Sequence, residues 1–150
     1  MIQRIQSIFL LLVFILMALT AFSPLLMLAD ASGTLFSFTS LAILVKNTQL
    51  HTWGVVSMAG LSALTALINI FFYNKRKAQI KLGWVTTILI ILFYVTVFVY
   101  FSSYASKFGF TISSVQYGII LPVIALIFNI LAIQRIKKDE KLVRSLDRIR

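Results

Sequence analysis

The chain has 150 residues, of which 60% are hydrophobic and 12% are charged, and its net charge is +10. Soluble domains are about 45–50% apolar and about 25% charged, so this composition excludes an ordinary soluble domain and favours lipid as the solvent. The chain contains no cysteine, which excludes disulfides and thiolate metal sites.

The first predicted membrane span covers residues 8–28, an uncharged run of 21 residues. A helix of about 20 residues crosses about 30 Å of hydrocarbon. Pro24 is expected either to kink the outer end of this helix or to mark where regular helix stops. A cleaved signal peptide is the competing interpretation, and Ala29-Asp30-Ala31 resembles a cleavage site. We reject it because the apolar run exceeds the usual length of about 7–15 residues.

Residues 30–52 are predicted to form a long extracytoplasmic loop that lies on the bundle or in the lipid interface. Within it, residues 36–39 (Phe-Ser-Phe-Thr) alternate with the period of a strand, and residues 108–111 (Phe-Gly-Phe-Thr) repeat the pattern. The two segments are candidates for a short strand pair outside the membrane. The alternative is a chance recurrence in a chain with 13 phenylalanines.

Three further spans are predicted at about residues 53–73, 82–104 and 115–134, with a short basic loop at 74–81. Twelve of the 14 Lys and Arg residues fall on one side of these spans, and Lys46 and Lys107 fall on the other. Basic residues collect on cytoplasmic flanks. The pattern therefore predicts an all-α membrane protein, an up-down bundle of four helices with both termini in the cytoplasm. Residues 1–134 form the membrane domain in this prediction, and residues 135–150 form a basic tail.

Small residues recur at helical spacing on the second and fourth spans. Small side chains let two membrane helices approach closely, so these faces are expected to contact other helices while bulky faces contact lipid. The predicted packing residues are Ala59, Ala63, Ala66, Asn69, Gly118, Pro122, Ala125 and Asn129.

Asn69 and Asn129 each lie six residues before a basic residue, Lys75 and Arg135 respectively. Both amides should therefore sit about 9 Å inside the cytoplasmic boundary. We predict that the second and fourth spans are neighbours joined by this pair, since amides usually form hydrogen bonds between membrane helices. The alternative is a polar site for a substrate. Similar segments at 66–70 and 125–130 also suggest that the two helical hairpins are a duplicated repeat.

The tail, residues 135–150, is predicted to continue the fourth helix, because opposite charges alternate at helical spacing without an interrupting Gly or Pro. One interpretation is electrostatic anchoring on anionic lipid headgroups, and the other is docking of a membrane or cytoplasmic protein. The three acidic residues of the tail favour protein contact. The predicted contact residues on the cytoplasmic side are Arg4, Lys75, Arg76, Lys77, Lys137, Lys138, Asp139, Glu140, Arg144, Asp147 and Arg148.

Three segments resemble an uncharacterised family of small four-span inner-membrane proteins from Bacteroidota-type bacteria. They are residues 2–6 (Ile-Gln-Arg-Ile-Gln), residues 74–82 (Asn-Lys-Arg-Lys-Ala-Gln-Ile-Lys-Leu) and the tail from 137 to 148. The resemblance covers the whole chain, and the tail is its most specific part. It implies four helices in a bacterial inner membrane, and it implies no activity, substrate or catalytic residue.

No charged residue lies inside the four predicted spans, which argues against a pump or proton-coupled carrier. His51 stands alone, and no catalytic triad, metal-ligand cluster or phosphate-binding loop is present in the sequence. We therefore expect no enzyme activity, cofactor or metal, and no nucleic-acid partner. The leading hypothesis is an accessory or scaffold subunit of a membrane assembly. The alternatives are an oligomeric transporter or channel lined by Asn69, Asn129 and Gln116, and a lipid-binding membrane protein.

Overall fold

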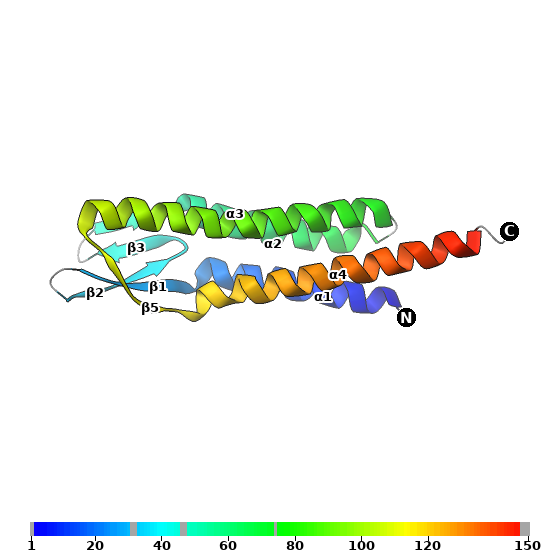
Figure 1. Cartoon of the computed structure of the whole chain (residues 1–150), viewed down its shortest axis with the longest axis horizontal. Coiled ribbons are helices and arrows are strands. Elements are labelled where there is room, and N and C mark those ends of the chain that lie inside the picture. The colour runs from blue at the N-terminus through cyan, green and yellow to red at the C-terminus, as the bar shows by residue number, and fades with distance from the viewer. Residues whose placement is uncertain (1, 31–32, 46–47, 74, 148–150) are drawn as a thin grey trace.

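Four long helices lie side by side, and a small sheet covers one end of them (Figure 1). The computed structural model describes residues 2–30, 33–45, 48–73 and 75–147. The helices are α1 (Ile2–Phe22), α2 (Trp53–Phe71), α3 (Arg76–Phe108) and α4 (Tyr117–Asp147). All four are long and apolar enough to cross a membrane. The chain runs up and down between the two ends, so both termini lie at the end opposite the sheet (Figure 1).

The helices form a ring in which each one packs against two others. Helix α1 contacts α2 and α4, and α3 also contacts α2 and α4. The second and fourth helices therefore lie across the diagonal, and the prediction that they are neighbours is wrong. Elements joined by short connections usually pack together, which places α3 between α2 and α4. The fourth helix then closes the ring against the first.

The third and fourth helices extend beyond the predicted spans. Helix α3 has 33 residues and includes most of the predicted basic loop at 74–81. It ends where Gly109 adopts a left-handed φ of 69°, a conformation that glycine tolerates without strain from a Cβ atom. Helix α4 continues without interruption to Asp147, which agrees with the predicted helical tail.

The first helix begins and ends earlier than the predicted span. It ends at Phe22, and residues Pro24–Ala29 form strand β1 instead of the last turns of a span. Proline has no backbone N–H, so it is tolerated as the first residue of a strand and cannot extend the helix ladder. Strand β1 is as apolar as the helix before it, because it lies between β2 and β5 and its residues Leu25, Leu26 and Leu28 are buried.

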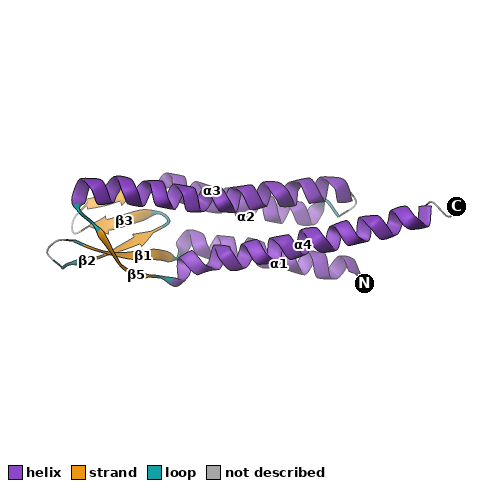
Figure 2. Ribbon diagram, viewed as in Figure 1, coloured by secondary structure: helices purple, strands orange, loops and turns teal. Residues whose placement is uncertain are grey.

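The predicted loop at 30–52 folds into strands. The sheet contains β1, β2 (Leu35–Thr39), β3 (Ala42–Val45), β4 (Thr48–His51) and β5 (Thr111–Val115), in the order β4-β3-β2-β1-β5 (Figure 2). Strand β1 pairs antiparallel with both β2 and β5. The first Phe-x-Phe-Thr segment lies in β2, whereas only Thr111 of the second lies in β5. Because β1 separates β2 from β5, the predicted direct pairing is wrong. Side chains of the two segments do meet, since the rings of Phe36 and Phe110 are 5.7 Å apart.

The sheet and the bundle share one apolar core. Leu25, Phe38 and Ile43 from the sheet are completely buried, as are Val13 and Met17 from α1, and all belong to one cluster. The join also uses side-chain hydrogen bonds. The Ser40 hydroxyl donates to the carbonyl oxygen of Thr20 at 2.8 Å, and the Thr52 hydroxyl donates to that of Ser40 at 2.9 Å.

Candidate functional site

We define the terminal end as the end of the bundle that carries the two termini. Three helices meet there at Asp139 of α4. Gln6 of α1 donates its side-chain amide to the Asp139 carboxylate, and the Arg76 guanidinium of α3 donates to the Asp139 carbonyl oxygen at 2.9 Å. Gln6 and Asp139 are both buried. A buried carboxylate needs such a donor, because its loss of hydration is otherwise uncompensated.

A second polar cluster lies on α3 around Gly83. Asn129 of α4 donates from its Nδ2 atom to the Gly83 carbonyl oxygen and to the Thr87 hydroxyl, both at 2.9 Å. A Cβ on Gly83 would lie 2.7 Å from the Ile133 side chain and 3.8 Å from Asn69 Nδ2. The missing side chain at this position thus lets α2, α3 and α4 approach one another.

Asn69 is completely buried, but the hydrogen bonding of its side chain differs from that of Asn129. Its backbone carbonyl oxygen accepts a hydrogen bond from the Gln79 side chain at 3.2 Å. Among the described residues, no hydrogen-bond partner reaches its Nδ2 or Oδ1 atoms. The predicted pairing of Asn69 with Asn129 is therefore wrong: both amides approach Gly83, but Asn129 bonds to α3. The diagonal placement of α2 and α4 explains this outcome.

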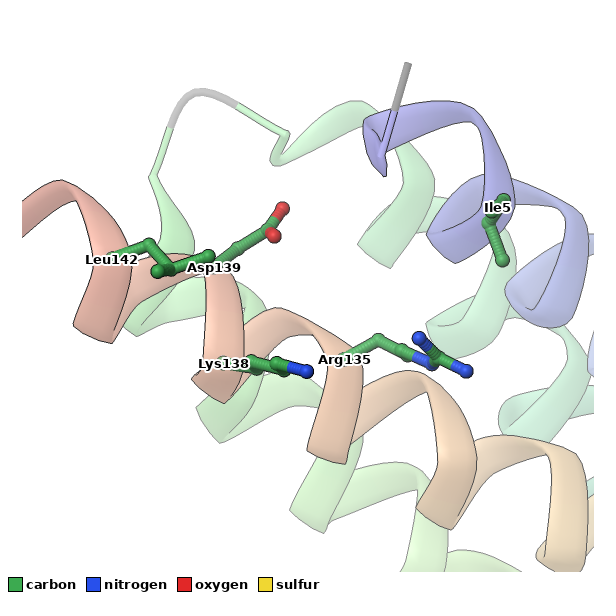
Figure 3. A pocket seen from close by; sticks show the side chains of 5 residues that line it. All are labelled: Ile5, Arg135, Lys138, Asp139 and Leu142. Atoms are coloured by element: carbon green, nitrogen blue, oxygen red, sulfur yellow. The ribbon is translucent and has the colours of Figure 1, made fainter.

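A shallow pocket of about 100 Å³ opens between α1 and α4 at the terminal end. Figure 3 shows the pocket, with Arg135 and Lys138 extending from α4 toward α1 and Ile5 on the opposite wall. Asp139 and Leu142 complete the lining. The pocket combines two cations with apolar walls at the point where the uncharged run of α4 ends.

The predicted packing residues lie inside the bundle. Each is buried: Ala59, Ala63, Ala66, Asn69, Gly118, Pro122, Ala125 and Asn129. The closest approach is at Gly118, where a Cβ would lie 2.3 Å from the backbone oxygen of Pro24. The small stripe of α4 therefore packs against β1 as well as against helices.

The predicted contact residues on the terminal side divide into two groups. Lys75, Lys77 and Lys138 are exposed. Others already contact neighbouring helices: Arg76 and Asp139 as described above, and Lys137 through its Nζ atom, which lies 5.6 Å from the centroid of the Trp84 ring. The prediction that Asp139 faces a partner is wrong, because its carboxylate is buried against α1. Glu140 is half-buried. Arg148 and the side chains of Arg4, Arg144 and Asp147 lie outside the described residues.

Two residues of the terminal end were missed by sequence reasoning. Gln6 and Gln79 are buried polar residues whose amides connect helices. A signal for Gln6 was present, because it falls on the helical face that also carries the buried Leu10, Val13 and Met17. A glutamine on a buried face requires a hydrogen-bond partner on another helix.

The sheet end offers less chemistry. His51 is exposed, and its ring lies 6.0 Å from that of Trp53, beside an open hollow of about 230 Å³ that Leu41 and Ala42 also line. Gln116 immediately precedes α4, and its backbone N–H donates to the Leu25 carbonyl oxygen at 3.0 Å. Within the described ranges, no group of three or more His, Asp and Glu side chains could hold a metal ion.

Comparison with known proteins gives the family. The model of the Domain of unknown function (DUF4293) family matches residues 2–149. The chain belongs to this family. No curated protein matches the chain. The family description assigns no activity.

Proposed function

We propose that this protein is a non-enzymatic subunit of a bacterial inner-membrane assembly, with both termini in the cytoplasm. The C-terminal end of α4 supports this proposal, because it extends beyond the other three helices (Figure 1). A helix that only spans a membrane needs about 20 residues, whereas α4 has 31. The residues of α4 beyond this length are also helical, so they are suited to contact a molecule outside the bilayer.

The surface of the α4 extension supports a protein partner. Its first two turns after Gln134 pack on the bundle, since Ile136 and Asp139 are buried. After Glu140 the helix presents Lys141, Leu142 and Val143 to its surroundings, and all three are exposed. Leu142 and Val143 are 48% and 42% exposed. Apolar side chains beside charges on a projecting helix suit a groove on another protein.

Membrane placement is the second part of the proposal. The four apolar helices support insertion, and the charge distribution supports the orientation, because every Lys and Arg in the described part of the chain except Lys107 lies toward the terminal end. In that orientation the sheet lies outside the cytoplasm. Cysteine accessibility mapping tests it: single cysteines at Lys77 and Ser113, both exposed, should react with impermeant reagents from opposite sides.

The partner experiment uses a substitution that leaves the bundle intact. Removal of residues 141–150 or the single change Val143→Glu should abolish co-purification of a defined protein from native membranes in mild detergent. The exposed Lys77→Glu substitution on α3 is the control, and it should preserve the complex. A wild-type chain that purifies alone would contradict the proposal, as would a partner that remains bound to V143E.

The transporter alternative has less support from two of its three proposed lining residues, Asn69 and Asn129, whereas the third, Gln116, is half-buried. A path between copies needs polar groups on an outer face, but Asn69 and Asn129 are enclosed within the bundle of a single chain. Asn129 is also engaged by Gly83 and Thr87. The accessory-subunit proposal is therefore the one that the arrangement supports best.

A further inference from the structure

The pocket between α1 and α4 has the composition of an anion site at a lipid boundary. We propose that it binds the phosphate group of an anionic phospholipid. Arg135 and Lys138 supply the positive charge, while Ile5 and Leu142 supply apolar walls. The inference rests on the membrane placement proposed above, but it is independent of any protein partner.

The two cations are placed to act on one anion. Residues three apart on a helix share a face, and Figure 3 shows both side chains directed to the same side of α4. The Arg135 guanidinium can form two parallel hydrogen bonds to phosphate oxygens, and the Lys138 ammonium adds a compact charge. Both side chains are exposed, so a headgroup can reach them.

The carboxylate of Asp139 also lines the pocket and would repel a phosphate if it faced the anion freely. It does not, because Gln6 donates to it and Asp139 as a residue is only 8% exposed. The stronger exposure of the two cations leaves the open part of the pocket positive. Gln6 does not neutralise Asp139 but holds its carboxylate against α1, and the two cations outweigh the one acid, so the pocket keeps a net positive charge.

The position of the pocket relative to the membrane surface matches the headgroup of a phospholipid better than a soluble anion. Arg135 is the first charged residue after the uncharged run of α4, so it marks where the hydrocarbon would end. Phe9 lies one helical turn after Ile5 on α1, on the side of the predicted hydrocarbon. Its ring stacks on that of Phe128 of α4, with the ring centroids 5.9 Å apart. This pair offers an apolar surface for an acyl chain whose headgroup occupies the pocket. Basic pockets between membrane helices commonly bind anionic headgroups in this manner.

The test uses the full-length protein in mild detergent and counts bound lipids by native mass spectrometry. Phosphatidylglycerol and phosphatidylcholine are added separately. The double substitution R135Q/K138Q should weaken phosphatidylglycerol binding by roughly 30-fold, because each nearby cation contributes about a factor of five. The control K77Q/K81Q removes two exposed charges from α3 at the same end, and its affinity should change less than about three-fold.

A second pair of variants keeps the test valid if the double substitution unfolds the protein. Leu142→Glu places a negative charge in the pocket and should also displace phosphatidylglycerol. Val143→Glu adds the same charge on the adjacent residue, which is not one of the residues that line the pocket, and should leave lipid binding intact. L142E therefore tests the lipid site, whereas V143E tests the protein partner.

Each of the following outcomes would overturn the inference. Equal losses in R135Q/K138Q and K77Q/K81Q would show a diffuse surface attraction without a site. Equal binding of phosphatidylcholine would remove the requirement for an anion, and displacement of the lipid by millimolar inorganic phosphate would assign the pocket to a soluble anion. Release of the chain from native membranes by alkaline carbonate would instead overturn the membrane placement. Retention under carbonate with unchanged lipid binding in L142E would overturn the pocket alone.

Discussion

The two ends of the bundle are closed by different physical means. At the sheet end, main-chain hydrogen bonds join β1 to two strands, and a cluster of completely buried side chains such as Leu25 and Phe38 covers the helix ends. At the terminal end, Gln6, Arg76 and Asp139 join the helices through side chains. The first closure leaves little exposed charge on its inner strands. The second leaves a pocket and a projecting helix available to other molecules.

This difference predicts that substitutions at the two ends have different effects. A closure made of backbone pairs and apolar packing is hard to vary, because each part depends on the others. A closure made of a few polar contacts exposes charged side chains that can bind lipid or protein. We therefore expect substitutions at the sheet end to change mainly stability, and exposed substitutions at the terminal end to change mainly binding.

The largest effect is expected for Phe38→Ala at the sheet end. The side chain is completely buried, and its loss leaves a cavity that costs about 3–5 kcal/mol. Leu35→Ala on the same strand is the control, because Leu35 is 59% exposed. Denaturant unfolding in detergent micelles, followed by circular dichroism, measures both. Equal stabilities for the two variants would contradict the sheet-end closure.

Gly118→Ala tests the contact between α4 and β1. The new Cβ would lie 2.3 Å from the Pro24 carbonyl oxygen, which belongs to the backbone and cannot rotate away. We expect a loss of about 1–3 kcal/mol in the free energy of unfolding. Gly60→Ala in α2 is the matched control, because a Cβ added there would meet nothing within 4 Å. That control should be neutral or stabilising by up to about 1 kcal/mol.

A double-mutant cycle at the terminal end measures the bond between Gln6 and Asp139. Hydrogen bonds to charged groups contribute about 1.5–3 kcal/mol. The single changes Gln6→Leu and Asp139→Leu should each destabilise, because each leaves the other polar group buried without its partner. The double variant should be more stable than the sum of the two losses implies. Additive losses would mean that the two side chains do not interact in solution.

The smallest effect is expected within the bundle and compares the two asparagines. Asn129→Leu removes two hydrogen bonds to α3, and such bonds contribute about 0.6 kcal/mol each on average in membrane proteins. Asn69→Leu removes a buried amide for which the described residues provide no side-chain partner, so it should be neutral or stabilising. Steric trapping or SDS unfolding measures the stability of both variants. A larger loss for N69L than for N129L would reverse this assignment.

Several features followed from local sequence pattern. The long apolar runs predicted the four helices, and the alternating charges after Gln134 predicted that α4 continues as a helix. Small residues at helical spacing marked the faces that are buried in the bundle. These predictions succeeded because each depends on residues within a few turns of one another.

Other features depended on contacts that no local pattern contains. Residues 24–29 read as the end of an apolar span, but they form a strand because β5 lies beside them, more than 80 residues later in the chain. The partner of Asn129 could not be predicted either, since the stripe identified the face of α4 but not which helix it meets.

Hydrophobic length and charge placement along the chain were enough to predict the number of apolar helices, the shared end of the termini and the helical tail, because both act locally. The ring order, the sheet, the Gln6–Asp139 bond and the pocket beside it became known only from the folded chain. These arise where helices and strands distant in the chain meet, and the energy of such contacts depends on the positions of both partners.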